Sequence, residues 1–118
     1  MREAAYQSKL MDKIVDRGGV VVNGMYTKDG ESDLQAGMPV NGIPVLVYVA
    51  IEVKTEKDYY RVMKCIDTDY NVINDKGLKK HEALQMYKIR NTRKRGGLAL
   101  VAFNIEQVDE YIRSILCK

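Results

Sequence analysis

The sequence is poor in the residues that mark several specialised classes of protein. Its 118 residues include two cysteines, two prolines and one histidine. Cys65 and Cys117 have neither the paired spacing of a zinc site nor the density of a secreted disulfide scaffold, and they indicate buried or half-buried thiols in a reducing compartment. His81 has no second histidine or cysteine cluster with which to form a zinc site or an acid-base pair, and we expect it on a helix surface.

Long apolar runs are also missing. No stretch reaches the length of a membrane span, and the segment from Met1 to Met11 mixes charged with apolar residues instead of forming a signal peptide. With 46% hydrophobic and 30% charged residues, the composition is typical of a globular protein with one hydrophobic core. We therefore expect one domain over residues 1–118, inside the cell and away from membranes.

The net charge of +3 arises from 19 basic and 16 acidic residues, so charge balance alone says little about a polyanionic partner. The distribution is more informative, because basic residues crowd the stretch from 79 to 95. Such a run can neutralise DNA phosphates without reading sequence, although it also fits a solvated helix face. The residues we expect to contact DNA are Lys79, Lys80, Lys88, Arg93, Lys94 and Arg95.

Apolar periodicity in the first half predicts a helix followed by strands. Residues 3–16 carry apolar side chains at three- and four-residue steps, and Gly18 and Gly19 are expected to end this helix. Val20 then begins a strand. Asn41 and Gly42 are typical of a hairpin turn that leads into the strand over residues 45–53.

The second half predicts a further helix, strand and helix. Residues 80–95 form a polar helix before Gly96, residues 98–103 form a strand buried on both faces, and Asn104 with Gln107 caps the last helix. The residues of this helix expected to face the core are Ile105, Val108, Ile112 and Ile115. The segment over residues 59–77 contains β-branched and aromatic residues around a turn, and it favours a hairpin.

Acidic and basic residues at the end of the strand over 45–53 are the candidates for chemistry. Glu52 and Lys54 share one strand face, while Val53 points to the core and leaves its carbonyl as a further metal ligand. Asp33 begins the preceding strand and can lie beside Glu52. Two carboxylates can hold a magnesium-type cation. A lysine can orient or deprotonate the attacking water, or stabilise the charge that builds on the phosphate. Glu-x-Lys on a strand is also a common solvent-facing pair, and an aspartate after a turn is commonly a local backbone acceptor.

These residues occur in an ordered set along most of the chain. Residues 30–34 (Gly-Glu-Ser-Asp-Leu) precede residues 51–55 (Ile-Glu-Val-Lys-Thr), and Gln85 then lies on a helix that ends at Gly96 before an apolar strand. The set resembles the virus-type replication-repair nuclease (VRR-NUC) domain of the PD-(D/E)XK nuclease superfamily. The resemblance implies an α/β fold with a restriction-endonuclease-like core, in the order α-β-β-β-α-β-α, built on a mixed central sheet.

The resemblance also implies roles for particular residues. Asp33 and Glu52 would bind Mg²⁺ or Mn²⁺ with help from the Val53 carbonyl, Lys54 would be the catalytic lysine, and Glu3 and Gln85 would support the site. The chain departs from the family at Ser32, where proline is frequent, and over residues 58–78, which read as an inserted β-hairpin beside the site.

The expected function is therefore a metal-dependent, structure-selective DNA endonuclease. Small stand-alone members of the family resemble homodimeric Holliday-junction resolvases, since a two-fold dimer supplies two symmetric cuts in branched DNA. We expect such a protein in the cytoplasm of a bacterial or phage-infected cell. The alternatives are a nuclease acting on flaps, nicks, single strands or any DNA, and a non-catalytic DNA-binding protein that keeps the fold.

Overall fold

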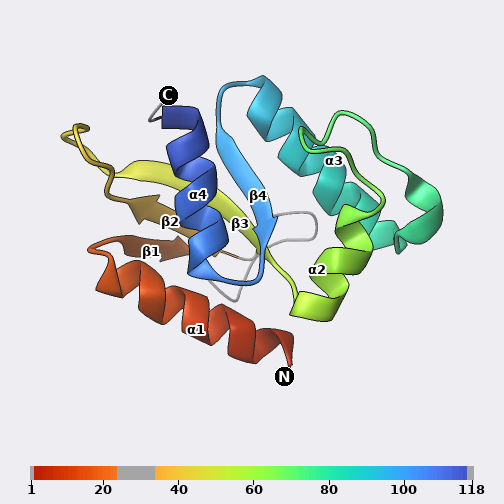
Figure 1. The fold of residues 1–118 in the computed structure, drawn as a ribbon, viewed down its shortest axis with the longest axis horizontal. Helices are drawn as coiled ribbons and strands as arrows, with labels where there is room; N and C mark the ends of the chain where they lie inside the picture. The colour runs from red at the N-terminus through yellow and green to blue at the C-terminus, as the bar shows by residue number, and fades with distance from the viewer. Residues whose placement is uncertain (1, 24–33, 117–118) are drawn as a thin grey trace.

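The computed structural model describes residues 2–23 and 34–116 of the chain. These residues form a mixed α/β fold, in which a four-stranded sheet lies between two helical layers (Figure 1). The strands are β1 (Val20–Asn23), β2 (Leu34–Met38), β3 (Val47–Val53) and β4 (Leu98–Ala102). They lie in the order β1-β2-β3-β4, and all neighbours are antiparallel except the parallel pair β3 and β4. The expected mixed α/β sheet is confirmed.

Two helices cover each face of the sheet. Leu10 and Ile14 of α1 (Glu3–Asp16) join α4 (Ile105–Leu116) in the larger hydrophobic cluster. On the opposite face, Val62 of α2 (Glu56–Met63) and Met86 of α3 (Lys80–Lys94) belong to a smaller cluster. No helix within the described ranges has the length and apolar character needed to cross a membrane. The candidate residues are thus carried by a sheet that is packed on both sides.

The alternation predicted for β3 is confirmed. Val49, Ile51 and Val53 enter the larger cluster, whereas Ala50 enters the smaller one. Because side chains alternate along a strand, Glu52 lies on the Ala50 face, which is covered by α2 and α3. The register of β3 therefore directs Glu52 toward α3.

The hairpin between β2 and β3 is confirmed, with a shorter second strand than expected. The N–H of Ile43 donates to the Val40 carbonyl at 3.1 Å, and Gly42 takes the left-handed backbone conformation (φ +84°) that this turn requires. Met38 pairs with Val47, so β3 begins there and not at Val45, which is exposed. The turn fixes the pairing that places Leu34 opposite Ile51.

The hairpin expected over residues 58–78 is wrong in its first part, and its second part is reduced to a single antiparallel bridge. Its first part is the helix α2, which Thr55 caps by accepting a hydrogen bond from the Asp58 N–H at 3.2 Å. A cap with acidic residues in the first turn favours a helix, and this local signal outweighs the β-branched and aromatic content. An isolated bridge between Ile66 and Ile73 and a 3₁₀ turn at Asp75–Gly77 follow α2.

The last helix begins as predicted but faces the core over a shorter length. The Asn104 side chain accepts from the Gln107 N–H at 3.0 Å, and the Gln107 side chain accepts from the Phe103 N–H at 2.7 Å. Ile105, Val108 and Ile112 are buried, whereas Ile115 is 45% exposed. The expectation for Ile115, in the last turn of α4, is wrong.

Side chains cover the free edge of β4. The hydroxyls of Tyr111 and Tyr70 accept from the Ala99 and Val101 N–H groups at 3.2 and 3.0 Å. The Arg93 Nε donates to the Ala99 carbonyl at 2.7 Å, and its guanidinium lies between the rings of Tyr70 and Tyr111. Backbone groups that would otherwise attract another strand are thereby satisfied.

Candidate active site

Two charged residues end the buried strand β3. The exposed fraction is 2% for Glu52 and 5% for Lys54, although both residue types usually lie at surfaces. The Lys54 N–H donates to the Ala102 carbonyl at 3.1 Å, which holds Lys54 at the end of the parallel pair. Burying these two side chains costs free energy unless polar partners compensate.

Gln85 of α3 is the partner of both residues. Its Nε2 donates to Glu52 Oε1 at 2.7 Å, and its Oε1 accepts from Lys54 Nζ at 3.1 Å. One amide thus bridges a carboxylate and an ammonium group that come from the same strand. The structure brings together three of the residues expected from sequence, and Val53 lies between Glu52 and Lys54 with its side chain in the core.

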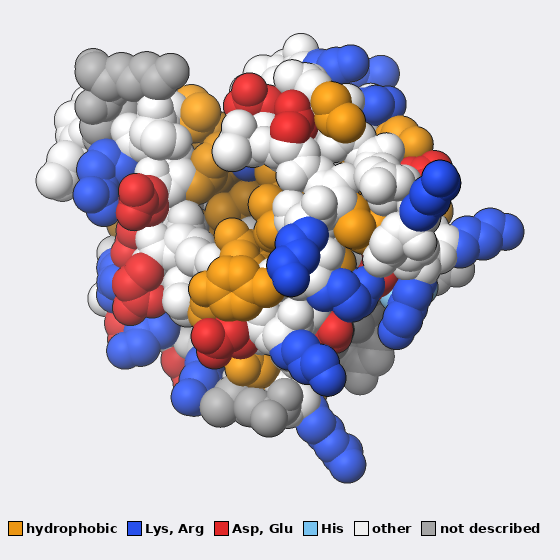
Figure 2. Space-filling model, turned by 45° about the vertical axis from the view of Figure 1, so that its right-hand side comes forward, with side chains coloured by type: hydrophobic (Ala, Val, Ile, Leu, Met, Phe, Trp, Pro, Cys, Tyr) orange, Lys and Arg blue, Asp and Glu red, His pale blue; other side chains and the backbone are white. Residues whose placement is uncertain are grey.

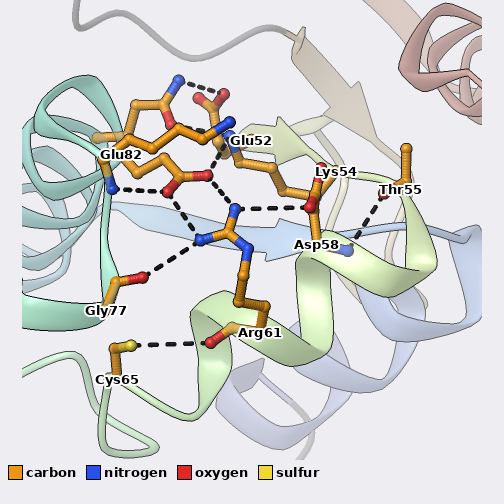
Figure 3. A network of polar contacts seen from close by, with 10 residues as sticks. Glu52, Lys54, Thr55, Asp58, Arg61, Cys65, Gly77 and Glu82 are labelled. Carbon is orange, nitrogen blue, oxygen red and sulfur yellow. Dashed lines mark hydrogen bonds and ion pairs between the residues drawn. The ribbon is translucent and has the colours of Figure 1, made fainter.

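Glu82 is a further member of this cluster that the sequence analysis missed. It is 2% exposed, and its Oε2 lies 3.9 Å from Lys54 Nζ. Figure 3 shows Glu82 between Lys54 and Arg61, with Arg61 extending from α2. Arg61 donates to both carboxylate oxygens, at 3.0 and 2.6 Å, and the Lys79 N–H donates to Oε1 at 2.9 Å.

These contacts decide the charge of Glu82. Burial by itself would raise the pKa of this carboxyl, but the hydrogen bonds from Arg61 and the Lys79 N–H, with the charges of Arg61 and Lys54, lower it from 4.5 to about 2. Glu82 is therefore ionised at neutral pH and attracts the Lys54 ammonium. Because these contacts lower the pKa of Glu82 in spite of its burial, the ion pair between Glu82 and Arg61 stabilises the folded protein.

One sequence signal could have found Glu82. It precedes Gln85 by three residues on a helix, and residues at this spacing lie on one face. Arg61 gives no comparable signal, because the segment that carries it was expected to be a hairpin. The Arg61 guanidinium also bonds Gly77 and Asp58, so it links α2 to the loop before α3.

Two further residues, Asp33 and Glu3, are expected at the same site. Asp33 lies outside the described residues. Glu3 is exposed in the first turn of α1, a helix that packs on the other face of the sheet from Gln85. The roles expected for Asp33 and Glu3 stay predictions.

The described residues supply part of a possible metal site. Within them, no group of three or more His, Cys, Asp or Glu side chains is arranged to hold a metal ion. Glu52 supplies one carboxylate, while Glu82 is already bonded to Arg61. A divalent cation takes oxygen ligands from carboxylates and carbonyls, and the Glu52 carboxylate is a ligand of this kind.

Most of the expected DNA-contacting residues are available at the surface, with one correction. Lys79, Lys80, Lys88, Lys94 and Arg95 are exposed. Arg93 instead donates to the Ala99 and Thr68 carbonyls and stacks between Tyr70 and Tyr111. Its guanidinium is used in packing, so it does not belong with the freely exposed basic residues. His81 lies exposed on α3, as expected.

Comparison of the chain with protein-family models, with curated proteins and with solved structures finds no match. A function for the chain therefore has to rest on its own residues.

Proposed function

We propose that the protein is a divalent-metal-dependent DNA endonuclease of the VRR-NUC type. The observation that carries this proposal is the Gln85 amide, which bridges buried Glu52 and Lys54 at the end of β3. Burying a carboxylate, an ammonium group and an amide costs several kcal/mol unless they are well paired. Chains retain such clusters where reactivity requires them, which makes the cluster a candidate for catalysis.

The order of elements is consistent with the proposed family. With α2 set aside as an insertion, the chain runs α1, β1, β2, β3, α3, β4, α4, which is the order proposed for a restriction-endonuclease-like core. The chain enters β2 at Leu34, which pairs with Ile51 beside Glu52. Asp33 directly precedes Leu34 in the sequence and is proposed as the second acidic residue.

Each residue of the cluster has a proposed role. A divalent cation bound by Glu52 and Asp33, with the Val53 carbonyl, would polarise the phosphate and make the attacking water more acidic. Lys54 Nζ donates hydrogen bonds to a phosphate oxygen and offsets the negative charge that develops there. Gln85 positions both Glu52 and Lys54. Glu82 holds the Lys54 side chain from the other side, and Glu3 is proposed to support the same site.

The proposed substrate is branched DNA bound to a homodimer. The exposed basic residues of α3 and its flanks would contact backbone phosphates on either side of the cut. A four-way junction requires two symmetric cuts, and each protomer would supply one site. Flaps, nicks and single strands are the alternative substrates within the same chemistry.

A cleavage assay tests this function. Labelled four-way junction, linear duplex, flap and single strand are incubated with Mg²⁺ or Mn²⁺ and, separately, with chelator. We expect metal-dependent cleavage with the junction preferred, and we expect Glu52→Gln and Lys54→Met each to reduce the rate at least about 100-fold. Circular dichroism and thermal unfolding establish that each variant is folded.

Lys57→Met is the matched control, because Lys57 is an exposed lysine on α2, and this variant should cleave normally. Failure to cut any substrate, or cutting that is indifferent to chelator and to Glu52→Gln, would refute the proposal. DNA binding that persists without cleavage and without any effect of Lys54→Ala would favour a non-catalytic DNA-binding protein, in which the cluster only stabilises the fold.

A further inference from the structure

A pocket of about 320 Å³ lies away from the candidate active site, where α3 ends and β4 begins. Residues from the end of α3, the start of β4 and α4 line it, together with Asp69 and Asn71. Figure 2 shows a hollow on this side of the molecule, with hydrophobic side chains on its floor, Asp or Glu side chains above it, and Lys and Arg side chains over the right-hand part of the surface. None of Glu52, Lys54, Gln85 and Glu82 contributes to its lining.

The charges in this pocket are predominantly positive. Arg90, Arg93 and Lys94 line it, against one carboxylate, that of Asp69. All three cations come from the last turns of α3, so they share one wall. A concave wall that concentrates charge of one sign favours a ligand of the opposite sign.

Arg90 has unused hydrogen-bonding capacity. Its guanidinium stacks on the Tyr87 ring at 4.8 Å, and its Nε is buried without a hydrogen-bond partner among the described residues. A buried donor that lacks an acceptor destabilises the folded protein, and more so when it is charged. The terminal nitrogens of the same guanidinium make no hydrogen bond among the described contacts, and an oxygen anion in the pocket would pair with them.

The other two cations of the wall differ in mobility. Arg93 is fixed by the Ala99 carbonyl and by two tyrosine rings, whereas Lys94 is exposed and free to move. A helix C-terminus repels anions when its last carbonyls are unpaired. Here the N–H groups of Gly96 and Gly97 donate to the Arg93 and Thr92 carbonyls at 3.1 and 2.9 Å, which reduces that repulsion.

We propose that this pocket binds a phosphate group, with Arg90 and Lys94 as its principal donors. The phosphate can belong to the DNA backbone or to free phosphate, and the first source rests on the function proposed above. Arg90 lies five residues beyond Gln85, about 7.5 Å along the helix axis at 1.5 Å per residue. A DNA strand bound at the candidate active site could therefore also be held at this pocket. This second contact would set how far along the strand the cut lies from the phosphate in the pocket.

The test measures binding in the presence of chelator, so that it does not depend on cleavage. Affinity for a labelled duplex and a four-way junction is measured by fluorescence anisotropy between 50 and 200 mM KCl. We expect Arg90→Gln and Lys94→Gln each to weaken DNA binding at least about fivefold and to reduce the salt-dependence slope by about one. Arg113→Gln, which removes one exposed charge from α4 outside the pocket, should change neither quantity beyond about twofold.

A second arm titrates the protein with inorganic phosphate and follows the amide signals of Gly96 and Gly97 by NMR. Signals that shift in the wild type and in Arg113→Gln, but not in Arg90→Gln, identify free phosphate as a ligand even if DNA affinity is unchanged. Lys94→Gln replaces an exposed side chain and keeps the test valid if Arg90→Gln does not fold. Equal effects of the pocket variants and Arg113→Gln in both arms would overturn the proposal.

Discussion

At the residue scale, the buried carboxylate of Glu82 makes the stability of the protein depend on pH. Its pKa is about 2 in the folded protein, against 4.5 for an unperturbed glutamate. A lowered pKa contributes stability that is fully present above pH about 4.5 and is lost as the pH falls toward about 2. The loss is at most about 3.5 kcal/mol, because one unit of pKa corresponds to about 1.4 kcal/mol.

Glu82→Gln should therefore lower the free energy of unfolding at pH 7 and flatten its decline between pH 5 and 2. Urea unfolding at a series of pH values measures both effects. Glu110→Gln, a change at an exposed position on α4, is the control and should follow the wild-type curve. A variant Glu82→Gln with the same slope as the wild type over this range would mean that Glu82 is not held ionised by Arg61 and its other neighbours.

Strand and helix periodicity predict part of the cluster around Glu82. Glu52 and Lys54 are charged residues at the end of an otherwise apolar strand, and strand periodicity alone places them on one face. Gln85 was expected from the resemblance and from its helical position. Arg61 could not be predicted, because its distance from Glu82 depends on how α2 packs, and Val62 is the one buried residue of that helix. Packing of Val62 in the smaller cluster and the polar contacts of Arg61 together hold α2 in place.

At the scale of elements, the strand β4 depends on side chains to complete its outer edge. Tyr70 is 2% exposed, and its hydroxyl pairs with the Val101 N–H. Its φ of 61° lies in the left-handed region, which costs a residue other than glycine about 1–2 kcal/mol. The contacts of its ring with Arg93 and its hydroxyl with β4 offset that strain.

Tyr70→Phe should destabilise the protein by about 1–3 kcal/mol, because it leaves the buried Val101 N–H without an acceptor. Hydrogen exchange at Val101 should accelerate accordingly. Tyr87→Phe is the matched control, since it removes a hydroxyl whose bonds to Asp75 are exposed, and it should cost less than about 0.5 kcal/mol. Equal losses in the two variants would show that the β4 edge does not depend on Tyr70.

Elements with strong periodicity were predictable, and those held by side-chain contacts were not. The bounds of α1 were expected as observed, since its apolar stripe and terminal glycines agree. The burial of β4 followed from its continuous apolar run. By contrast, α2 is eight residues long, with aromatic and β-branched residues that also suit a strand, and the Thr55 cap decided between the two. A capping signal from one residue is easily overlooked when the composition of the whole segment favours a strand.

At the scale of the whole molecule, the packing of the sheet leaves part of its surface open. The smaller cluster under α2 and α3 draws on β3 and β4, while Val20 of β1 and Tyr48 of β3 are each about half exposed. One protomer has one Glu52 cluster, so the proposed paired cleavage of a junction requires a second protomer. The oligomeric state therefore tests the proposed junction substrate more directly than the cleavage chemistry, which would be the same for flaps or single strands.

Light scattering at the concentration of the cleavage assay should give about twice the chain mass of 13.5 kDa. Mixing wild-type protein with an excess of Glu52→Gln protein should then yield junctions cut in one strand, because most active protomers would be paired with inactive partners. An excess of Lys57→Met protein is the control and should leave paired cuts unchanged. A monomer that still cleaves DNA would retain the nuclease proposal but exclude junction resolution by a preformed dimer, and it would direct attention to flaps and single strands.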